Sequence, residues 1–188
     1  MPLFDHFGIL APFYEFFIKP TPPEKLWQLA DLPASGTLLD AGGGTGRVAQ
    51  FMNEKIDRIV VADLSFPMLQ QARQKEGLRT VNTHTERLPF PDASFDRVIM
   101  VDALHHVCDQ AETAAALWRV LKPGGRIVIE EPDLGHFGVK LVALAEKLAL
   151  MRSHFLAPAE IVSLFDDFGA RTRIEKDGYI SWVMIEKS

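Results

Sequence analysis

The most informative stretch of this 188-residue sequence reads Leu38-Leu39-Asp40-Ala41-Gly42-Gly43-Gly44-Thr45-Gly46-Arg47. An apolar run, typical of a buried strand, leads into a cluster of glycines and then into a segment that predicts a helix. Glycine tolerates positive φ and lets the backbone approach a ligand without a Cβ in the way. The start of a helix offers unpaired amides and a positive dipole end, which suit an anionic group. The stretch therefore predicts a ligand-binding loop between a strand and a helix, and a tight turn without a ligand is the simpler alternative.

Short apolar runs alternate with helical patterns on both sides of this stretch. Strands are predicted at residues 37–39, 58–62, 78–82, 95–101, 126–130, 171–176 and 180–186, and helices at residues 24–31, 47–53, 67–75, 111–121 and 157–168. Apolar strands interleaved with helices indicate a parallel sheet that is covered on both faces. The turn signal Lys176-Asp177-Gly178 predicts a hairpin, so the last strand should run antiparallel to its neighbours. The fold class is α/β.

Composition narrows the classes of function. The net charge of −5 and the absence of a basic stripe argue against nucleic-acid binding. Cys108 is the only cysteine, so no internal disulfide can form, which favours a reducing compartment. Neither a signal peptide nor an apolar stretch long enough to span a membrane is predicted, and the expected location is the cytoplasm. The length suits one domain.

A dinucleotide-dependent oxidoreductase is one alternative for the glycine loop. Gly44-Thr45-Gly46-Arg47-Val48-Ala49 matches the pattern G-x-G-x-x-G/A, and Asp63 follows at the distance expected of a ribose-binding acid. That spacing suits both cofactor classes and does not discriminate between them. Asp40 does discriminate, because a carboxylate before the glycines suits a cofactor with an ammonium and a sulfonium better than one with a pyrophosphate.

The motif Asp40-x-Gly42-x-Gly44-x-Gly46 resembles motif I of the class I S-adenosylmethionine-dependent methyltransferases. The resemblance extends over about a hundred residues, and within the superfamily it is strongest to the ubiquinone/menaquinone-type C-methyltransferases and their small-molecule relatives. The N-terminal arm with its aromatic residues also resembles their cap. The further motifs, in the order expected of the family, are VADLSFPML (61–69), LPFPDASFD (88–96), LHHV (104–107) and RVLKPGGR (119–126).

The resemblance implies a Rossmann-like, seven-stranded sheet, mostly parallel with one antiparallel C-terminal strand, and helices on both faces. It also implies one methyltransferase domain over residues 1–188. Its expected parts are a cap arm at residues 1–21, a cofactor-binding core at 36–132, and lid helices with a C-terminal β-hairpin at 133–188. Residues 137–151, apolar on most sides, are interpreted as a helix buried between cap and sheet or as a lid wall for an apolar acceptor.

The same resemblance implies a role for each residue of an S-adenosylmethionine site. The glycine loop with Thr45 would hold the methionine end, Asp40 would lie near the ammonium, and Asp63 would accept both ribose hydroxyls. Side chains at 64 and 68 would cover the adenine, residues 84–86 would edge it, and residue 101 would back the methionine portion. The expected cofactor residues are Asp40, Gly42, Gly44, Thr45, Gly46, Asp63, Leu64, Met68, His84, Thr85, Glu86 and Val101.

His84 departs from the pattern of the family. Relatives often place an aspartate there, which accepts a hydrogen bond from the adenine amino group. A neutral histidine can accept through one ring nitrogen, whereas a protonated one cannot. Cofactor affinity is therefore expected to depend on pH.

The resemblance implies transfer of a methyl group to a small-molecule acceptor. If residues 137–151 form an apolar lid, the acceptor is expected to be apolar. Methyl transfer needs positioning and desolvation, and a base only when the acceptor must lose a proton. His105, His154 and Tyr14 are the candidates for that base, and no metal is expected. A catalytically silent cofactor-binding or regulatory module on the same fold is the alternative from another class. The acceptor, its reacting atom and the oligomeric state stay open.

Overall fold

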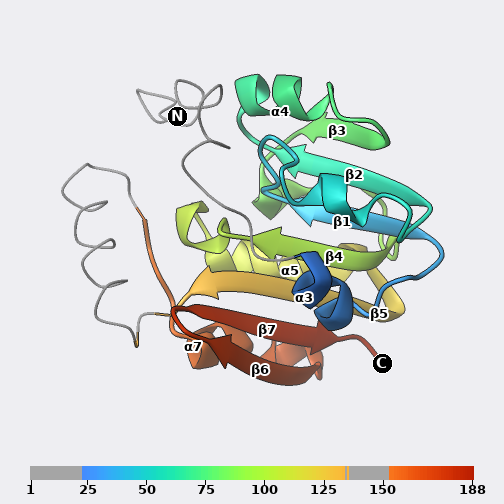
Figure 1. The fold of residues 1–188 in the computed structure, drawn as a ribbon. Helices are drawn as coiled ribbons and strands as arrows, with labels where there is room; N and C mark the ends of the chain where they lie inside the picture. The colour runs from blue at the N-terminus through green and yellow to red at the C-terminus, as the bar shows by residue number, and fades with distance from the viewer. Residues whose placement is uncertain (1–22, 134, 136–152) are drawn as a thin grey trace.

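The computed structural model describes residues 23–133, 135 and 153–188 (Figure 1). The predicted cap arm at residues 1–21, with Tyr14, and the predicted helix at residues 137–151 lie outside the described residues.

A single sheet with the strand order β3-β2-β1-β4-β5-β7-β6 forms the centre of the described fold. β7 is antiparallel to both β5 and β6, and every other pair is parallel. Figure 1 shows the arrow of β7 running against its neighbours. The predicted seven-stranded sheet with an antiparallel C-terminal strand is confirmed. The strands are β1 (Thr37–Ala41), β2 (Arg58–Asp63), β3 (Leu78–Asn82), β4 (Phe95–Val101), β5 (Leu121–Pro132), β6 (Arg171–Asp177) and β7 (Ile180–Glu186).

Helices cover both faces of the sheet, as predicted. One face packs against α3 (Pro23–Leu29), the 3₁₀ turn η1 (Ala49–Met52) and α4 (Phe66–Ala72). The other packs against α5 (Gln110–Val120) and α7 (Pro158–Ser163), and Figure 1 shows α3 and α5 on opposite sides. Side chains of β4 alternate between the two cores, with Val98 and Met100 in one and Ile99 and Val101 in the other. The short 3₁₀ turns η2 (Thr85–Arg87), η3 (Leu104–His106) and η4 (Asp166–Phe168) are the remaining elements of the described residues.

The predicted helix at residues 47–53 is wrong in type, because only the 3₁₀ turn η1 forms there. The indole Nε1 of Trp27 donates to the Phe51 carbonyl at 2.9 Å, and that carbonyl would have to accept from the backbone if a helix continued. Asn53 then leaves helical geometry with ψ of 144°. The Phe51 amide donates to the Val48 carbonyl three residues back, at 3.0 Å, which is the bonding of a 3₁₀ turn, and the Phe51 carbonyl is left to the Trp27 side chain.

Two of the family-like motifs hold the framework together away from the glycine loop. Arg119 donates from Nη1 to the Phe90 carbonyl at 2.7 Å and from Nη2 to the Leu88 carbonyl at 2.8 Å. Lys122 donates to Asp96, whose Oδ2 also accepts from the Thr37 amide at 2.8 Å. These motif residues therefore fix the loop before β4 and the starts of β1 and β5.

Candidate functional site

The glycine loop follows β1 at the carboxyl edge, the edge of the sheet where β1 to β5 end. Gly42, Gly44 and Gly46 have φ of 71°, 53° and 70°, a region that other residues rarely adopt. A Cβ on Gly42 would also lie 2.7 Å from the Cβ of Ala103, in the loop after β4. Both backbone conformation and close packing thus require glycine here. The ends of parallel strands are where α/β proteins commonly bind ligands.

Asp63, the last residue of β2, lies against the glycine loop. Its Oδ2 accepts from the Gly44 amide at 2.8 Å, and its Oδ1 accepts from the Ser65 amide at 2.7 Å. Met68 is buried, and a Cβ on Gly44 would come within 3.2 Å of its Sδ. Leu64 is 51% exposed. The structure therefore brings Asp63, Met68 and the glycines together, with the apolar Leu64 side chain left at the surface nearby.

Asp40 lies beneath the loop and is almost fully buried, with 1% of its surface exposed. A Cβ on Gly43 would lie 2.4 Å from its Cγ. Neither carboxyl oxygen has a hydrogen-bond partner among the described residues. Burial raises the pKa of Asp40 to about 7, against the opposing effect of the Arg47 guanidinium and with a further increase from Asp63. The protein therefore holds a poorly solvated carboxyl group, which keeps its proton more readily than an ordinary aspartate, directly under the loop.

Arg47 and Asp102 join this cluster, and sequence reasoning had not singled out either of them. Arg47 is buried, and its Nη2 lies 3.8 Å from Oδ2 of Asp102. Asp102 follows β4 directly and has φ of 55°, which is strained for a residue with a side chain. The available signal was its position, since an acid just after a buried strand lies at the carboxyl edge with the glycine loop.

The turn η2 lies beside Asp63, because the Thr83 amide donates to the Asp63 carbonyl at 3.0 Å. The His84 side chain is 56% exposed, and its Nδ1 is 3.8 Å from Oε2 of Glu86. Thr85 is buried. Glu86 points toward the start of α5, where its Oε1 accepts from the Cys108 amide at 2.9 Å. Of these three predicted residues, only His84 has a largely solvent-exposed side chain.

The remaining candidates lie at the ends of β4 and β5. Val101, the last residue of β4, is buried. His105 in η3 is also buried, and its Nδ1 lies 2.5 Å from Oε2 of Glu131. His154 is exposed, and its backbone amide donates to the His105 carbonyl at 2.7 Å. Two further buried acids follow Val128 and Ile129 in β5: Glu130 accepts from the Trp182 indole at 2.5 Å, and Glu131 is the partner of His105. The sequence signal missed was this acidic pair inside an apolar strand.

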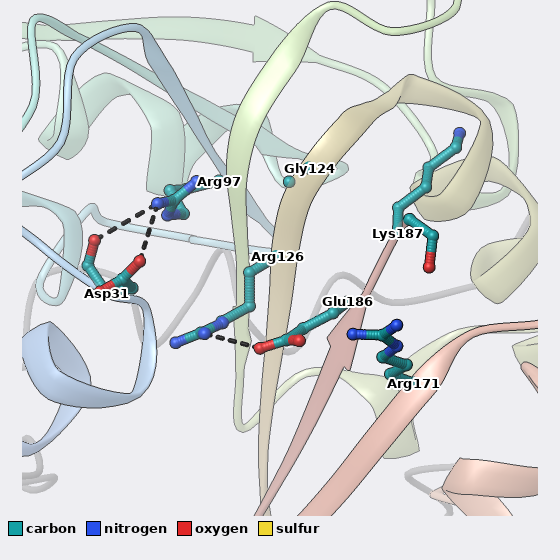
Figure 2. A pocket seen from close by; sticks show the side chains of 9 residues that line it. Asp31, Arg97, Gly124, Arg126, Arg171, Glu186 and Lys187 are labelled. Atoms are coloured by element: carbon teal, nitrogen blue, oxygen red, sulfur yellow. Dashed lines mark hydrogen bonds and ion pairs between the residues drawn. The ribbon is translucent and has the colours of Figure 1, made fainter.

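A separate cavity of about 280 Å³ lies at the opposite edge of the sheet, where β4 and β5 begin (Figure 2). Arg97 and Arg126 line it, but their guanidinium groups are bonded to Asp31 and Glu186 respectively. Because parallel strands place their carboxyl ends at the other edge, this cavity does not coincide with the glycine loop. It is a gap between the salt-bridged ends of the strands.

Comparisons with known proteins concern the part of the chain that carries the glycine loop. Residues 39–129 match a family model described as a methyltransferase domain. A demethylmenaquinone methyltransferase from Deinococcus radiodurans is 38% identical over 111 residues, 54% of this chain and 46% of that protein. A ubiquinone/menaquinone biosynthesis C-methyltransferase from Enterobacter sp. is 33% identical over 122 residues, 57% of this chain and 49% of that protein. The chain thus spans about half the length of the curated relatives it matches.

Solved structures share the fold. An S-adenosylmethionine-dependent methyltransferase from Thermotoga maritima superimposes with a TM-score of 0.73 at 20% identity, covering 97% of this chain and 99% of that one. At this identity the similarity concerns the fold. Separately, none of the helices in the described part of the chain has the length and apolar character that a membrane crossing requires.

Proposed function

Since this chain carries a class I S-adenosylmethionine-dependent methyltransferase domain, we propose that it transfers a methyl group from S-adenosylmethionine to a small-molecule acceptor. The fold and the carboxyl-edge cluster suit this activity, because the glycine loop, Asp40 and Asp63 lie together where the strands end.

The buried carboxyl of Asp40 is the observation that carries the proposal. A buried polar group without a partner is costly, and Asp40 has none among the described residues. S-adenosylmethionine brings an ammonium and a sulfonium, and either cation would compensate this carboxyl. A pyrophosphate would instead place negative charge beside both Asp40 and Asp63, which electrostatic repulsion opposes. The site therefore fits S-adenosylmethionine better than a nicotinamide dinucleotide.

The other residues fit the remaining parts of the cofactor. A carboxylate offers about four lone-pair positions, so Asp63 can retain the Gly44 amide and still accept ribose hydroxyls. Leu64 would cover the adenine from the surface and Met68 would support it from beside Gly44. Glu86 would act through the backbone, by holding the η2 turn against α5.

The bound cofactor supplies an electrophilic methyl group, and the protein's part is to position the acceptor and exclude water. We propose a carbon atom of a small, neutral ring as the acceptor, because two relatives are named for demethylmenaquinone methylation and for C-methylation in quinone biosynthesis. Val101 and Ala103 at the end of β4 supply an apolar wall beside the glycine loop.

Calorimetric titration of the full chain with S-adenosylmethionine and with a nicotinamide dinucleotide tests the cofactor. Binding of the first alone is expected, whereas binding of the dinucleotide alone would contradict the proposal. Methyl transfer is then screened against a metabolite library by release of S-adenosylhomocysteine. A protein that binds the cofactor but releases none with any acceptor would support a silent binding module instead.

The exposed His84 side chain predicts a pH effect on cofactor affinity. If its neutral ring accepts from the adenine amino group, protonation sets a donor against a donor, and affinity should fall toward acid pH. Asparagine retains an acceptor and does not titrate. Calorimetry on wild type and His84→Asn should therefore show a decline in the wild type that the variant lacks. Identical pH profiles would show that His84 does not contact the adenine.

A further inference from the structure

The glycine loop lies on the carboxyl of Asp40 but gives it no hydrogen bond. The amides of Gly42 and Gly43 both donate to the Ala62 carbonyl, at 2.7 Å and 3.4 Å. The Gly44 amide donates to the acid at the end of β2, at 2.8 Å. The donors of the loop nearest to Asp40 are therefore used elsewhere, and neither oxygen of its carboxyl has a hydrogen-bond partner among the described residues.

The carboxyl of Asp40 is also shielded from water. A Cβ on Gly43 would lie 2.4 Å from its Oδ2 and 2.9 Å from its Oδ1, so both oxygens lie against the backbone of the loop. Within the sheet, Asp40 is flanked in register by the apolar Val61 of β2 and Ile99 of β4. Only 1% of its surface is exposed. A charge bound on the loop would thus act on this carboxyl through a region with little solvent to screen it.

The fixed charges around Asp40 do not overcome the effect of burial. Burial raises the pKa of Asp40 to about 7, the Arg47 guanidinium acts against this increase, and Asp63 adds to it. The guanidinium of Arg47 also faces Asp102 after β4, at 3.8 Å. Beyond α4, the Lys75 ammonium is bonded to a carbonyl of the loop at 2.8 Å. Asp40 is therefore an acid whose ionisation a bound ligand can change.

The proposed cofactor and its product differ in charge at the methionine end. S-adenosylmethionine carries a carboxylate, an ammonium and a sulfonium, which leaves a net positive charge. In S-adenosylhomocysteine the sulfur is a neutral thioether, and the molecule has no net charge. A positive charge near a poorly solvated carboxyl favours its ionised form. The cofactor should therefore stabilise the carboxylate of Asp40 more than the product does.

We propose that Asp40 discriminates between cofactor and product by charge: it ionises when S-adenosylmethionine binds, and it takes up a proton again once the sulfonium has become a thioether. The site thereby prefers the cofactor over the product. This inference rests on the proposed function, and it adds a residue that sets the selectivity of the site.

The proton balance needs no further reactant. When the cofactor binds, the O–H bond of Asp40 breaks, its electron pair stays on the carboxylate oxygen, and the proton goes to the solvent. During methyl transfer the carbon–sulfur bond breaks and its electron pair stays on sulfur, which removes the positive charge. Asp40 then takes a proton from the solvent. Well above the raised pKa, Asp40 is already ionised in the free protein, and its attraction to the sulfonium favours the cofactor without proton release.

The test measures the affinities of S-adenosylmethionine and S-adenosylhomocysteine by calorimetry from about pH 5 to about pH 8, a range that includes the raised pKa of Asp40. The ratio of the two affinities is compared, because the adenine and ribose are common to both ligands and a pH effect from His84 cancels. In the wild type, the preference for S-adenosylmethionine should increase by about tenfold as the pH rises, the effect of a one-unit difference in the Asp40 pKa between the two complexes.

Asp40→Asn is the decisive variant, since asparagine has nearly the same shape and does not ionise. Its preference for S-adenosylmethionine should be weaker than that of the wild type at the upper end of the range, and it should not change with pH. Asp57→Asn is the matched control. Asp57 accepts from the Gly36 amide and precedes β2, at the opposite edge of the sheet, so this variant should behave as the wild type does.

Proton release is a second measurement, and it needs no variant. Calorimetry of the wild type is repeated just below the raised pKa of Asp40, in two buffers that differ in their enthalpy of ionisation. The dependence of the binding enthalpy on the buffer gives the number of protons released. S-adenosylmethionine should release more than S-adenosylhomocysteine, because only the former carries the sulfonium.

The outcomes separate this inference from the proposed function. A wild type that binds neither ligand contradicts the proposed function itself. The inference alone is overturned if the wild type binds S-adenosylmethionine with a preference that does not change with pH. It is also overturned if Asp40→Asn shows the pH dependence of the wild type, or if the two ligands release equal numbers of protons.

Discussion

Asp63→Ala is expected to weaken S-adenosylmethionine binding by about 2–3 kcal/mol, the scale of hydrogen bonds lost from a charged group. The reason is its position at the end of β2, where the carboxylate touches the glycine loop through the Gly44 amide. Calorimetry at constant pH measures the change. Thermal unfolding of the same variant shows whether the loop survives without its acceptor.

Asp57→Ala is a matched control for this prediction. Asp57 also accepts from a glycine amide, that of Gly36 at 2.8 Å, but it precedes β2 and so lies at the opposite edge of the sheet. Its loss should leave cofactor affinity unchanged. Equal affinity for wild type, Asp63→Ala and Asp57→Ala would remove Asp63 from the binding site.

Asp40→Asn is expected to change how stability depends on pH. The pKa of Asp40 is raised from 3.8 to about 7 by burial, so the native state binds more protons than the unfolded state between these values. The contribution of Asp40 to wild-type stability should therefore be largest near pH 4 and should decline as the pH rises toward 7. At 1.36 kcal/mol per unit of pKa, the free energy of unfolding of the variant should rise relative to that of the wild type by about 2–4 kcal/mol across that range.

Denaturant unfolding of both proteins at pH 4.5 and pH 8 measures this difference. Because asparagine has nearly the same shape, the change between the two pH values isolates the ionisation of the carboxyl. A stability difference that is the same at both pH values would show that Asp40 ionises normally. The variant should also bind S-adenosylmethionine more weakly, because the buried carboxyl is proposed to face a cofactor cation.

The strands could largely be predicted from local pattern. Residues 95–101 and 180–186 form β4 and β7 with the predicted bounds, since apolar runs of this length bury on both faces of a covered sheet. The reversal of β7 followed from Asp177-Gly178, and Gly178 does adopt a positive φ of 57° in that hairpin. The α-helix predicted at residues 47–53 does not form, because a segment this short can close as a 3₁₀ turn with the same hydrophobic pattern, and only η1 is present there.

The sequence by itself determined the order of the elements and placed the glycine loop and Asp63 at strand ends, because hydrophobic periodicity and glycine are local properties. Only the tertiary structure decided the environment of the charged groups. Burial without a hydrogen-bond partner among the described residues is what makes Asp40 unusual, and the pairing of His105 with Glu131 joins residues 26 positions apart. Such pairs form when neighbouring parallel strands end side by side, so they depend on sheet order and desolvation, which no single stretch of sequence contains.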